Sequence, residues 1–218
     1  MTRASRILAT LVLVTSMAAA PVWAAGGKVR GDKAAGPAGT TGPGLVDTNR
    51  GDGVCDNYTV TGTLSEVETE YLLFMVQEEK LARDVYLFLS DFYAPDEPIL
   101  ARIFQNIGAS EQRHMNAVSK LIDGYGLENP VEGYAAGEFP ESAADFSGLY
   151  NDLLIAGQES YCAALDVGIQ IEELDIEDLE TDLEGVEAEN VARVFGNLLK
   201  GSYNHLNTFA YWSELNCR

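Results

Sequence analysis

The chain contains two histidines, His114 and His205, and each follows a polar residue three positions earlier. Glu111 precedes His114, and Ser202 precedes His205. Residues three apart lie on the same face of a helix, so each pair would point to one place. Carboxylate oxygen and imidazole nitrogen suit iron and manganese. The E-x-x-H pair therefore indicates a metal site, but alone it is weak evidence because helices in an acidic chain sample this spacing often.

Both pairs, Glu111 with His114 and Ser202 with His205, lie on lines of apolar residues that repeat at steps of three and four. Such a line marks the buried seam of a helix in a bundle, where apolar side chains are expected throughout. The polar pair on each seam therefore requires an explanation. The apolar neighbours are Phe104, Ile107, Val118 and Leu121 around the first pair, and Val191, Phe195, Leu198 and Phe209 around the second.

Acidic residues interrupt apolar seams in two further segments. In the first, Glu79 lies on the seam and Glu78 on a neighbouring apolar face, so one of the two faces the core. In the second, Glu172 lies on the seam, Asp175 follows one turn later, and Glu173 is the alternative. We choose Glu79 and Glu172. The seam residues are Leu72, Met75, Ala82 and Tyr86 in the first segment, and Leu165, Gly168 and Leu179 in the second.

Acids at similar heights on four seams require compensating positive charge, because a buried unpaired carboxylate costs several kcal/mol. Two metal cations would supply that charge. A Glu from each of two helices, with E-x-x-H pairs from the other two, is the ligand set of di-iron carboxylate bundles. We therefore predict a dinuclear iron or manganese site. Its ligands are Glu79, Glu111, His114, Glu172 and His205.

Two explanations without a metal stay open. The glutamates can be solvated surface acids of a very acidic protein, with both histidines as hydrogen-bonded core residues. Alternatively, Arg83 and Arg113 can pair with buried acids inside the same bundle.

The signals for helix starts and ends place the Glu79 seam and the Glu111 seam on two consecutive helices, which form one hairpin. Ser65 and Glu68 form a capping box, and the helix that follows meets no Gly or Pro until Pro95. A second helix begins near Pro98 and ends at Gly126. Apolar residues surround most of the first helix, which is typical of a helix inside a bundle.

A long Gly- and Pro-containing connection, residues 126–144, separates the two halves of the chain. A connection of this length can return the chain along the bundle, so that the third helix runs parallel to the second. The third helix is expected over residues 145–176 and the fourth over 187–215, joined by an acidic connection, 177–189. The prediction is an all-α, ferritin-like four-helix bundle with a long crossover between helices two and three.

The first 24 residues form an expected secretory signal peptide, with Arg3 and Arg6 before an apolar run that is too short to span a bilayer. Cleavage is expected after Ala24; the alternative is an uncleaved anchor. Residues 25–63 are rich in Gly, Ala and Thr and are expected to be a flexible tail, followed by a domain over 64–216. We therefore expect a periplasmic or secreted protein with no membrane span after leader cleavage.

The net charge of −20 excludes nucleic acid and anionic lipid as expected partners and leaves metal ions and a small oxidant. Export would place the three cysteines, Cys55, Cys162 and Cys217, where disulfides persist. One of them must stay unpaired or pair between chains. A Cys55–Cys217 bridge would tie the domain ends together. The cysteines lack the spacing of a thiolate metal site.

Four blocks of sequence resemble the ferritin-like DUF2202 domain family over about residues 64–216. They are EEKLARDVY, IGASEQRHMNAVSKLIDGYGLENP, ALDVGIQIEELDIEDL and GSYNHLNTF. The resemblance implies a ferritin-like fold and a metal centre, but no activity, because the family's activity is unassigned.

A more distant similarity to ferritins and rubrerythrins implies the same five ligands and adds Tyr86 as a redox-active or hydrogen-bonding neighbour, or as plain core. Ser202 departs from that pattern, because ferritins and rubrerythrins have Glu there. Either Asp175 replaces the missing carboxylate or one metal position is weak.

The sequence leads to two hypotheses for function. The first is an oxidoreductase whose iron or manganese reacts with dioxygen or peroxide. The second is a non-catalytic metal-binding or structural periplasmic module. A third possibility is a storage cage of many subunits. The expected flexible tail and the expected signal peptide both argue against it. We expect a monomer or dimer.

Overall fold

The computed structural model describes residues 60, 62–142 and 144–217. The predicted leader, nearly all of the predicted tail, and Cys55 lie outside these residues. Within them the chain is helical and contains no strand, so the all-α prediction is confirmed. None of the described helices is long and apolar enough to span a membrane. The helices are α2 (Glu66–Tyr93), α3 (Pro98–Gly124), α4 (Phe146–Gly157), α5 (Tyr161–Gly185) and α6 (Glu189–Asn216).

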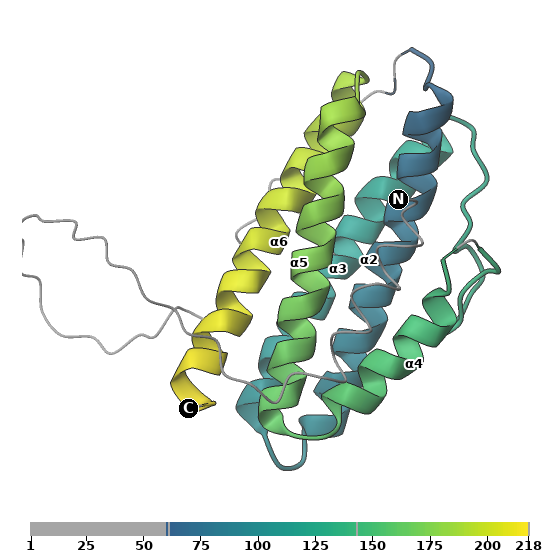
Figure 1. Cartoon of the computed structure of the whole chain (residues 1–218). Helices are drawn as coiled ribbons and strands as arrows, with labels where there is room; N and C mark the ends of the chain where they lie inside the picture. Colours follow the sequence, from purple (N-terminus) through teal and green to yellow (C-terminus); the bar gives the residue numbers. More distant parts are fainter. Residues whose placement is uncertain (1–59, 61, 143, 218) are drawn as a thin grey trace, which may run out of the picture.

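The four long helices form a bundle of two hairpins (Figure 1). Helix α2 packs chiefly on α3, and α5 on α6. The long crossover after α3 carries the chain back along the bundle, so α3 and α5 run in the same direction (Figure 1). The predicted crossover between the two halves of the bundle is therefore confirmed.

Helix α2 begins with the predicted capping box. The Glu68 backbone N–H donates to the Ser65 hydroxyl, and the Ser65 N–H donates to the Glu68 carboxylate. The other Glu68 oxygen accepts hydrogen bonds from the backbone N–H groups of Glu187 and Ala188, at 2.9 and 2.8 Å. This one carboxylate thus caps α2 and holds the connection between α5 and α6 against it.

The prediction of a single third helix over residues 145–176 is wrong. The structure has two helices here, because Ser160 adopts an extended backbone and its side chain caps a new helix by accepting from the Ala163 N–H. The first helix, α4, ends at Gly157, whose carbonyl accepts a hydrogen bond from the Tyr93 hydroxyl.

The predicted acidic connection, residues 177–189, is also mostly wrong. Helix α5 continues to Gly185, which leaves only residues 186–188 between α5 and α6. Ile176 and Leu179 are buried on the core side of this stretch. The helical spacing of these apolar residues continues the seam, so the surrounding acids occupy a helix and not a loop.

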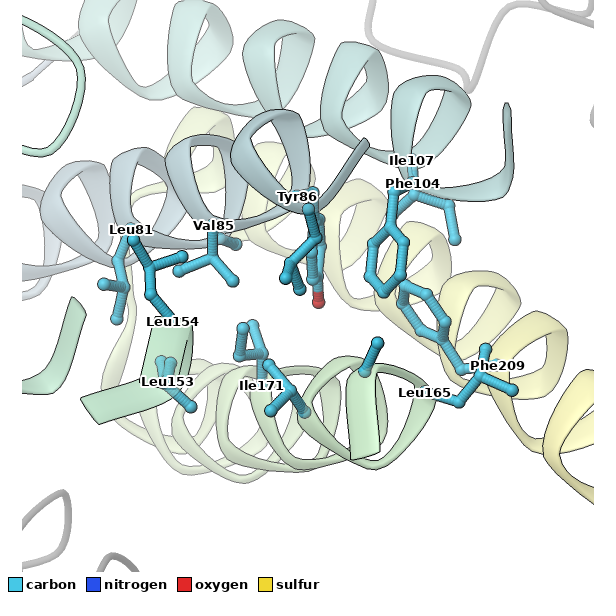
Figure 2. Packing of buried hydrophobic residues seen from close by; sticks show 14 of the residues in the cluster. Leu81, Val85, Tyr86, Phe104, Ile107, Leu153, Leu154, Leu165, Ile171 and Phe209 are labelled. Atoms are coloured by element: carbon cyan, nitrogen blue, oxygen red, sulfur yellow. The ribbon is translucent and has the colours of Figure 1, made fainter. Parts of the chain in front are cut away.

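The apolar core has two parts, with the polar seam residues between them. One part surrounds Tyr86, Phe104 and Phe209, whose rings pack together as Figure 2 shows. The other surrounds Leu121 and Phe195 near the opposite end of the bundle. Each long helix contributes to both parts, so the polar residues lie at the middle of the bundle.

The N-terminus of α5 and the C-terminus of α6 are joined by a disulfide between Cys162 and Cys217, with the two Cα atoms 5.7 Å apart. The predicted Cys55–Cys217 bridge is therefore wrong. The two helices run antiparallel, which brings the first turn of one beside the last turn of the other (Figure 1).

A buried ion pair that the sequence did not predict anchors the crossover to α2. Lys80 and Asp84 are both almost fully buried, and the ammonium lies 2.5 Å from the Asp84 carboxylate. The same ammonium donates to the Ala135 carbonyl and lies over the Phe139 ring. Asp84 also accepts from the Gly137 backbone N–H. Two residues of α2 thus hold the segment that leads into α4.

Candidate metal centre

The five predicted ligand residues are all buried and meet at the middle of the bundle. They form two groups, each close enough to hold one metal ion. One group contains Glu79, Glu111 and His114, and the other contains Glu111, Glu172 and His205. Glu111 belongs to both groups, and each group adds one histidine and one further carboxylate.

The two groups have similar internal distances. His114 Nδ1 lies 2.7 Å from Glu111 Oε2 and 3.4 Å from Glu79 Oε2. His205 Nδ1 lies 2.7 Å from Glu111 Oε1 and 3.5 Å from Glu172 Oε2. The two imidazole rings face each other with centroids 5.5 Å apart. Glu111 therefore presents one oxygen to each histidine and lies between the groups.

Several of these buried atoms lack a well-aligned hydrogen bond. Although Glu111 oxygens lie 2.7 Å away, neither His114 Nδ1 nor His205 Nδ1 has a hydrogen bond of acceptable geometry among the described residues. Glu79 Oε1 and Glu111 Oε1 are likewise buried without one. Ligands about 2.1 Å from one ion lie about 3–4 Å from each other. The distances of 3.4 and 3.5 Å fall in this range, and the two of 2.7 Å lie below it. The donor set therefore fits a pair of metal ions.

Without metal, the histidines supply the positive charge. Burial would lower the pKa of His205, but the Glu111 and Glu172 carboxylates raise it to about 10. The pKa of His114 is likewise raised well above its usual value, because Glu111 and Glu79 outweigh the effect of burial. Burial would raise the pKa of Glu111, but the two histidines lower it far below its usual range. Metal binding must displace these imidazole protons.

Residues 68–218 match the model of a family described as an uncharacterized protein domain, DUF2202. The chain belongs to the DUF2202 family. It is 43% identical over 146 residues to the uncharacterized protein MJ0754 of Methanocaldococcus jannaschii, a match that covers 67% of this chain and 75% of that protein. The crystal structure of the hypothetical protein MJ0754 superposes with a TM-score of 0.66 at 40% identity, covering 72% of this chain and 85% of that one.

The sequence left two choices open, Glu78 or Glu79 and Glu172 or Glu173, and the structure of the present DUF2202 chain shows where these side chains lie. Glu79 faces His114, whereas Glu78 lines a cavity beside the site. Glu172 is buried next to His205, whereas Glu173 is exposed. The positions of Glu79 and Glu172 therefore agree with the choices made from the seams.

Arg83 does pair with a buried acid, as the alternative without a metal expected, but this acid is Asp84 and not one of the five candidate ligands. Its guanidinium contacts Asp84 and the Gln112 side chain. Arg83 therefore belongs to the anchor of the crossover and not to the centre of the bundle.

Ser202 occupies the position where a second E-x-x-H pair would have a glutamate, and its side chain contacts Asp175. The Ser202 hydroxyl lies 2.5 Å from Asp175 Oδ2 and 2.9 Å from the Leu198 carbonyl. Burial, and next the negative charge of Glu172, raise the pKa of Asp175 to about 7. Asp175 belongs to neither three-residue group, so it is a neighbour of the site.

Tyr86 connects the site to the aromatic part of the core. Its hydroxyl donates to Glu172 Oε1 at 2.7 Å, and its ring packs against Phe104 and Phe209 (Figure 2). Burial, together with the nearby Glu172 carboxylate, raises the pKa of Tyr86 well above its usual value. Tyr86 therefore holds its proton and fixes the orientation of Glu172.

Sequence reasoning missed Gly201 as part of the site. A Cβ atom at this position would lie 2.6 Å from both Cε1 and Nε2 of His114. The missing side chain lets α6 approach the imidazole closely, while Nδ1 of that ring faces the carboxylates. The only signal in the sequence was a glycine directly before Ser202 on a helical seam.

Proposed function

We propose that this DUF2202 protein binds two iron or manganese ions at the middle of its bundle and uses them in redox chemistry with dioxygen or peroxide. One observation carries the proposal: Glu111 is shared by two buried groups that each contain a histidine and a second carboxylate. That donor set resembles those of ferritins and rubrerythrins. When bound, the ions would supply electrons and Lewis acidity.

The protein's own residues have defined tasks in this proposal. Glu111 would be a ligand at both positions, and the histidines and outer glutamates would complete them. Tyr86 orients Glu172 through its hydrogen bond, and Gly201 leaves room for the His114 ring. The apolar residues on both sides of the site exclude bulk water, which strengthens electrostatic interactions inside it.

We also propose that the protein works outside the cytoplasm. The Cys162–Cys217 disulfide supports this location, because such bonds persist mainly in oxidising compartments. The leader-like first 24 residues also support it.

The direct test is the metal content per chain of protein purified without chelators. We expect about two iron or manganese ions per chain in the wild type. Glu111→Ala should remove both, because both positions share this carboxylate, whereas His205→Ala should remove about one. Circular dichroism would show that the variants remain folded. A wild-type protein with no bound metal, or a folded Glu111→Ala variant with full metal content, would overturn the proposal.

The second candidate function is metal binding without turnover, and Ser202 favours it. Position 202 offers a hydroxyl that is already bonded to Asp175 and Leu198, so the second histidine pair lacks its carboxylate. The test is the absorption spectrum of iron-loaded protein before and after addition of dioxygen or peroxide. A spectral change supports the oxidoreductase, and an unchanged spectrum with tight metal binding supports the binding module.

A further inference from the structure

A cavity between α2, α4 and α5 opens onto the carboxylate side of the candidate metal centre. Five carboxylates line its inner side: Glu78, Glu79, Glu111, Glu172 and Asp175. Its outer walls are apolar and come from three helices: Ala82 from α2, Leu149 and Leu153 from α4, and Ile171 from α5. Figure 2 shows Leu153 and Ile171 on the side of the core that faces Leu81 and Val85.

The cavity is small and mainly apolar. The space open to the centre of a water-sized molecule is about 30 Å³, and a single water requires about 10–15 Å³ measured in this way. It therefore has room for a molecule of two or three heavy atoms. Water or peroxide can form hydrogen bonds only where it reaches the carboxylates, and between the apolar walls it would lose them. An uncharged apolar molecule loses none.

Helix α4 forms one wall of this cavity, with a buried face toward it and an exposed face toward solvent. Leu149 and Leu153 are buried, whereas Ile155 on the same helix is 66% exposed. The helix is held at both ends: Tyr93 bonds to Gly157 at its C-terminus, and the Lys80–Asp84 pair anchors the crossover that precedes it. Its position over the cavity is thus fixed by contacts away from the metal centre.

We propose that this cavity binds small, uncharged, apolar molecules of the size of dioxygen and admits them to the carboxylate end of the site past Leu149 and Leu153. Binding to the cavity is independent of the metal, whereas its role as the oxidant's route rests on the proposed function. The apolar walls favour dioxygen as the oxidant that this route serves.

The first test uses xenon, an apolar atom of suitable size, and the metal-free protein. In crystals pressurised with xenon, we expect an atom between Leu149 and Ile171 in the wild type. Leu149→Trp should fill the cavity and abolish that site, and Ala82→Leu should fill it from the opposite wall. Ile155→Trp, the matched control on the exposed face of α4, should keep it. An empty cavity in the wild type, or full occupancy in a folded Leu149→Trp or Ala82→Leu variant, would overturn the proposal.

The second test measures iron(II) oxidation and metal content together. We expect Leu149→Trp or Ala82→Leu to keep the wild-type metal content and to slow oxidation by dioxygen at least tenfold, with Ile155→Trp unchanged. Full metal content with an unchanged rate in both cavity variants would overturn the route but leave the metal centre standing. Xenon in the cavity of a protein that binds no metal would overturn the proposed function and leave the binding site standing.

Discussion

The imidazole ring of His114 packs directly on the backbone of Gly201, where α3 and α6 meet at the candidate metal centre. A Cβ at Gly201 would lie 2.6 Å from two ring atoms, closer than such atoms approach each other. We predict that Gly201→Ala displaces the ring, lowers the unfolding free energy by about 1–3 kcal/mol and lowers the metal content. Thermal unfolding and metal analysis measure the two effects.

Gly196→Ala is the matched control on the same helix, because nothing lies within 4 Å of a Cβ at that position. It should keep the metal and gain about 0.5–1 kcal/mol from the better helix former. Equal metal content in the two variants would contradict a positioning role for Gly201.

Neighbouring acids on α5 provide a test of the individual ligands. We predict that Glu172→Ala lowers the metal content by about one ion per chain, because Glu172 lies beside His205 in the second group. Glu173→Ala should leave it unchanged, because Glu173 is exposed one residue away. Metal analysis of both proteins decides the matter, and equal metal loss in both variants would argue against a specific site.

The seam pattern limited the inward acids to two neighbouring candidates on each of two helices, and it favoured Glu79 over Glu78 and Glu172 over Glu173. Glu79, Glu111, His114, Glu172 and His205 each lie on a line of apolar residues, and a helix buries such a line as a unit. Helical periodicity alone gives these side-chain directions. It did not predict that Glu78, Asp178 and Asp182 are buried as well.

The break between α4 and α5 and the role of Gly201 could not be predicted in the same way. In the structure the Ser160 side chain caps α5. A serine inside one continuous helix is equally compatible with the sequence, so the break could not be read from this residue. The contact between Gly201 and His114 joins α6 to α3, and no local pattern encodes such a contact. The same holds for the Lys80–Asp84 pair, whose partners include the distant residue Ala135.

Glu68 should make stability depend on pH in the acid range. Burial would raise the pKa of this carboxyl, but hydrogen bonds from Ser65, Ala188 and Glu187 outweigh it and lower the pKa below the usual value of 4.5. The unfolded chain then binds the proton more readily, so the charged Glu68 stabilises the fold above the usual pKa and this stabilisation is lost as pH falls through the lowered one.

We therefore predict that Glu68→Gln loses about 1–2 kcal/mol at pH 7 and that its difference from wild type shrinks below about pH 4.5. Urea unfolding at a series of pH values measures this difference. Glu70→Gln, exposed on the same helix, should stay close to wild type throughout. A Glu68→Gln deficit that stays constant down to pH 2 would mean that the charge is not responsible.

Because the disulfide joins Cys162 to Cys217, removing Cys162 should affect stability more than removing Cys55. Cys162→Ser should lower the unfolding free energy by about 2–4 kcal/mol, because the Cys162–Cys217 bond closes a loop with a sequence separation of 55. Cys55→Ser should have little effect, because Cys217 is already paired. Denaturant unfolding, with peptide mapping by mass spectrometry, tests both. A peptide that links Cys55 to Cys217 would contradict the bond in the structure.

The Lys80–Asp84 pair should be essential to the crossover, because removing one member leaves a buried charge uncompensated. We predict that Asp84→Ala lowers the unfolding free energy by about 3–5 kcal/mol, whereas Asp91→Ala, exposed on the same helix, changes it little. Replacing both charges, as in Lys80→Met with Asp84→Leu, should recover most of the loss. Hydrogen exchange adds a local measurement. The Gly137 amide donates to Asp84, so it should exchange faster in Asp84→Ala and in the double variant. If Asp84→Ala were as stable as Asp91→Ala, contacts other than this ion pair would have to hold the crossover and α4.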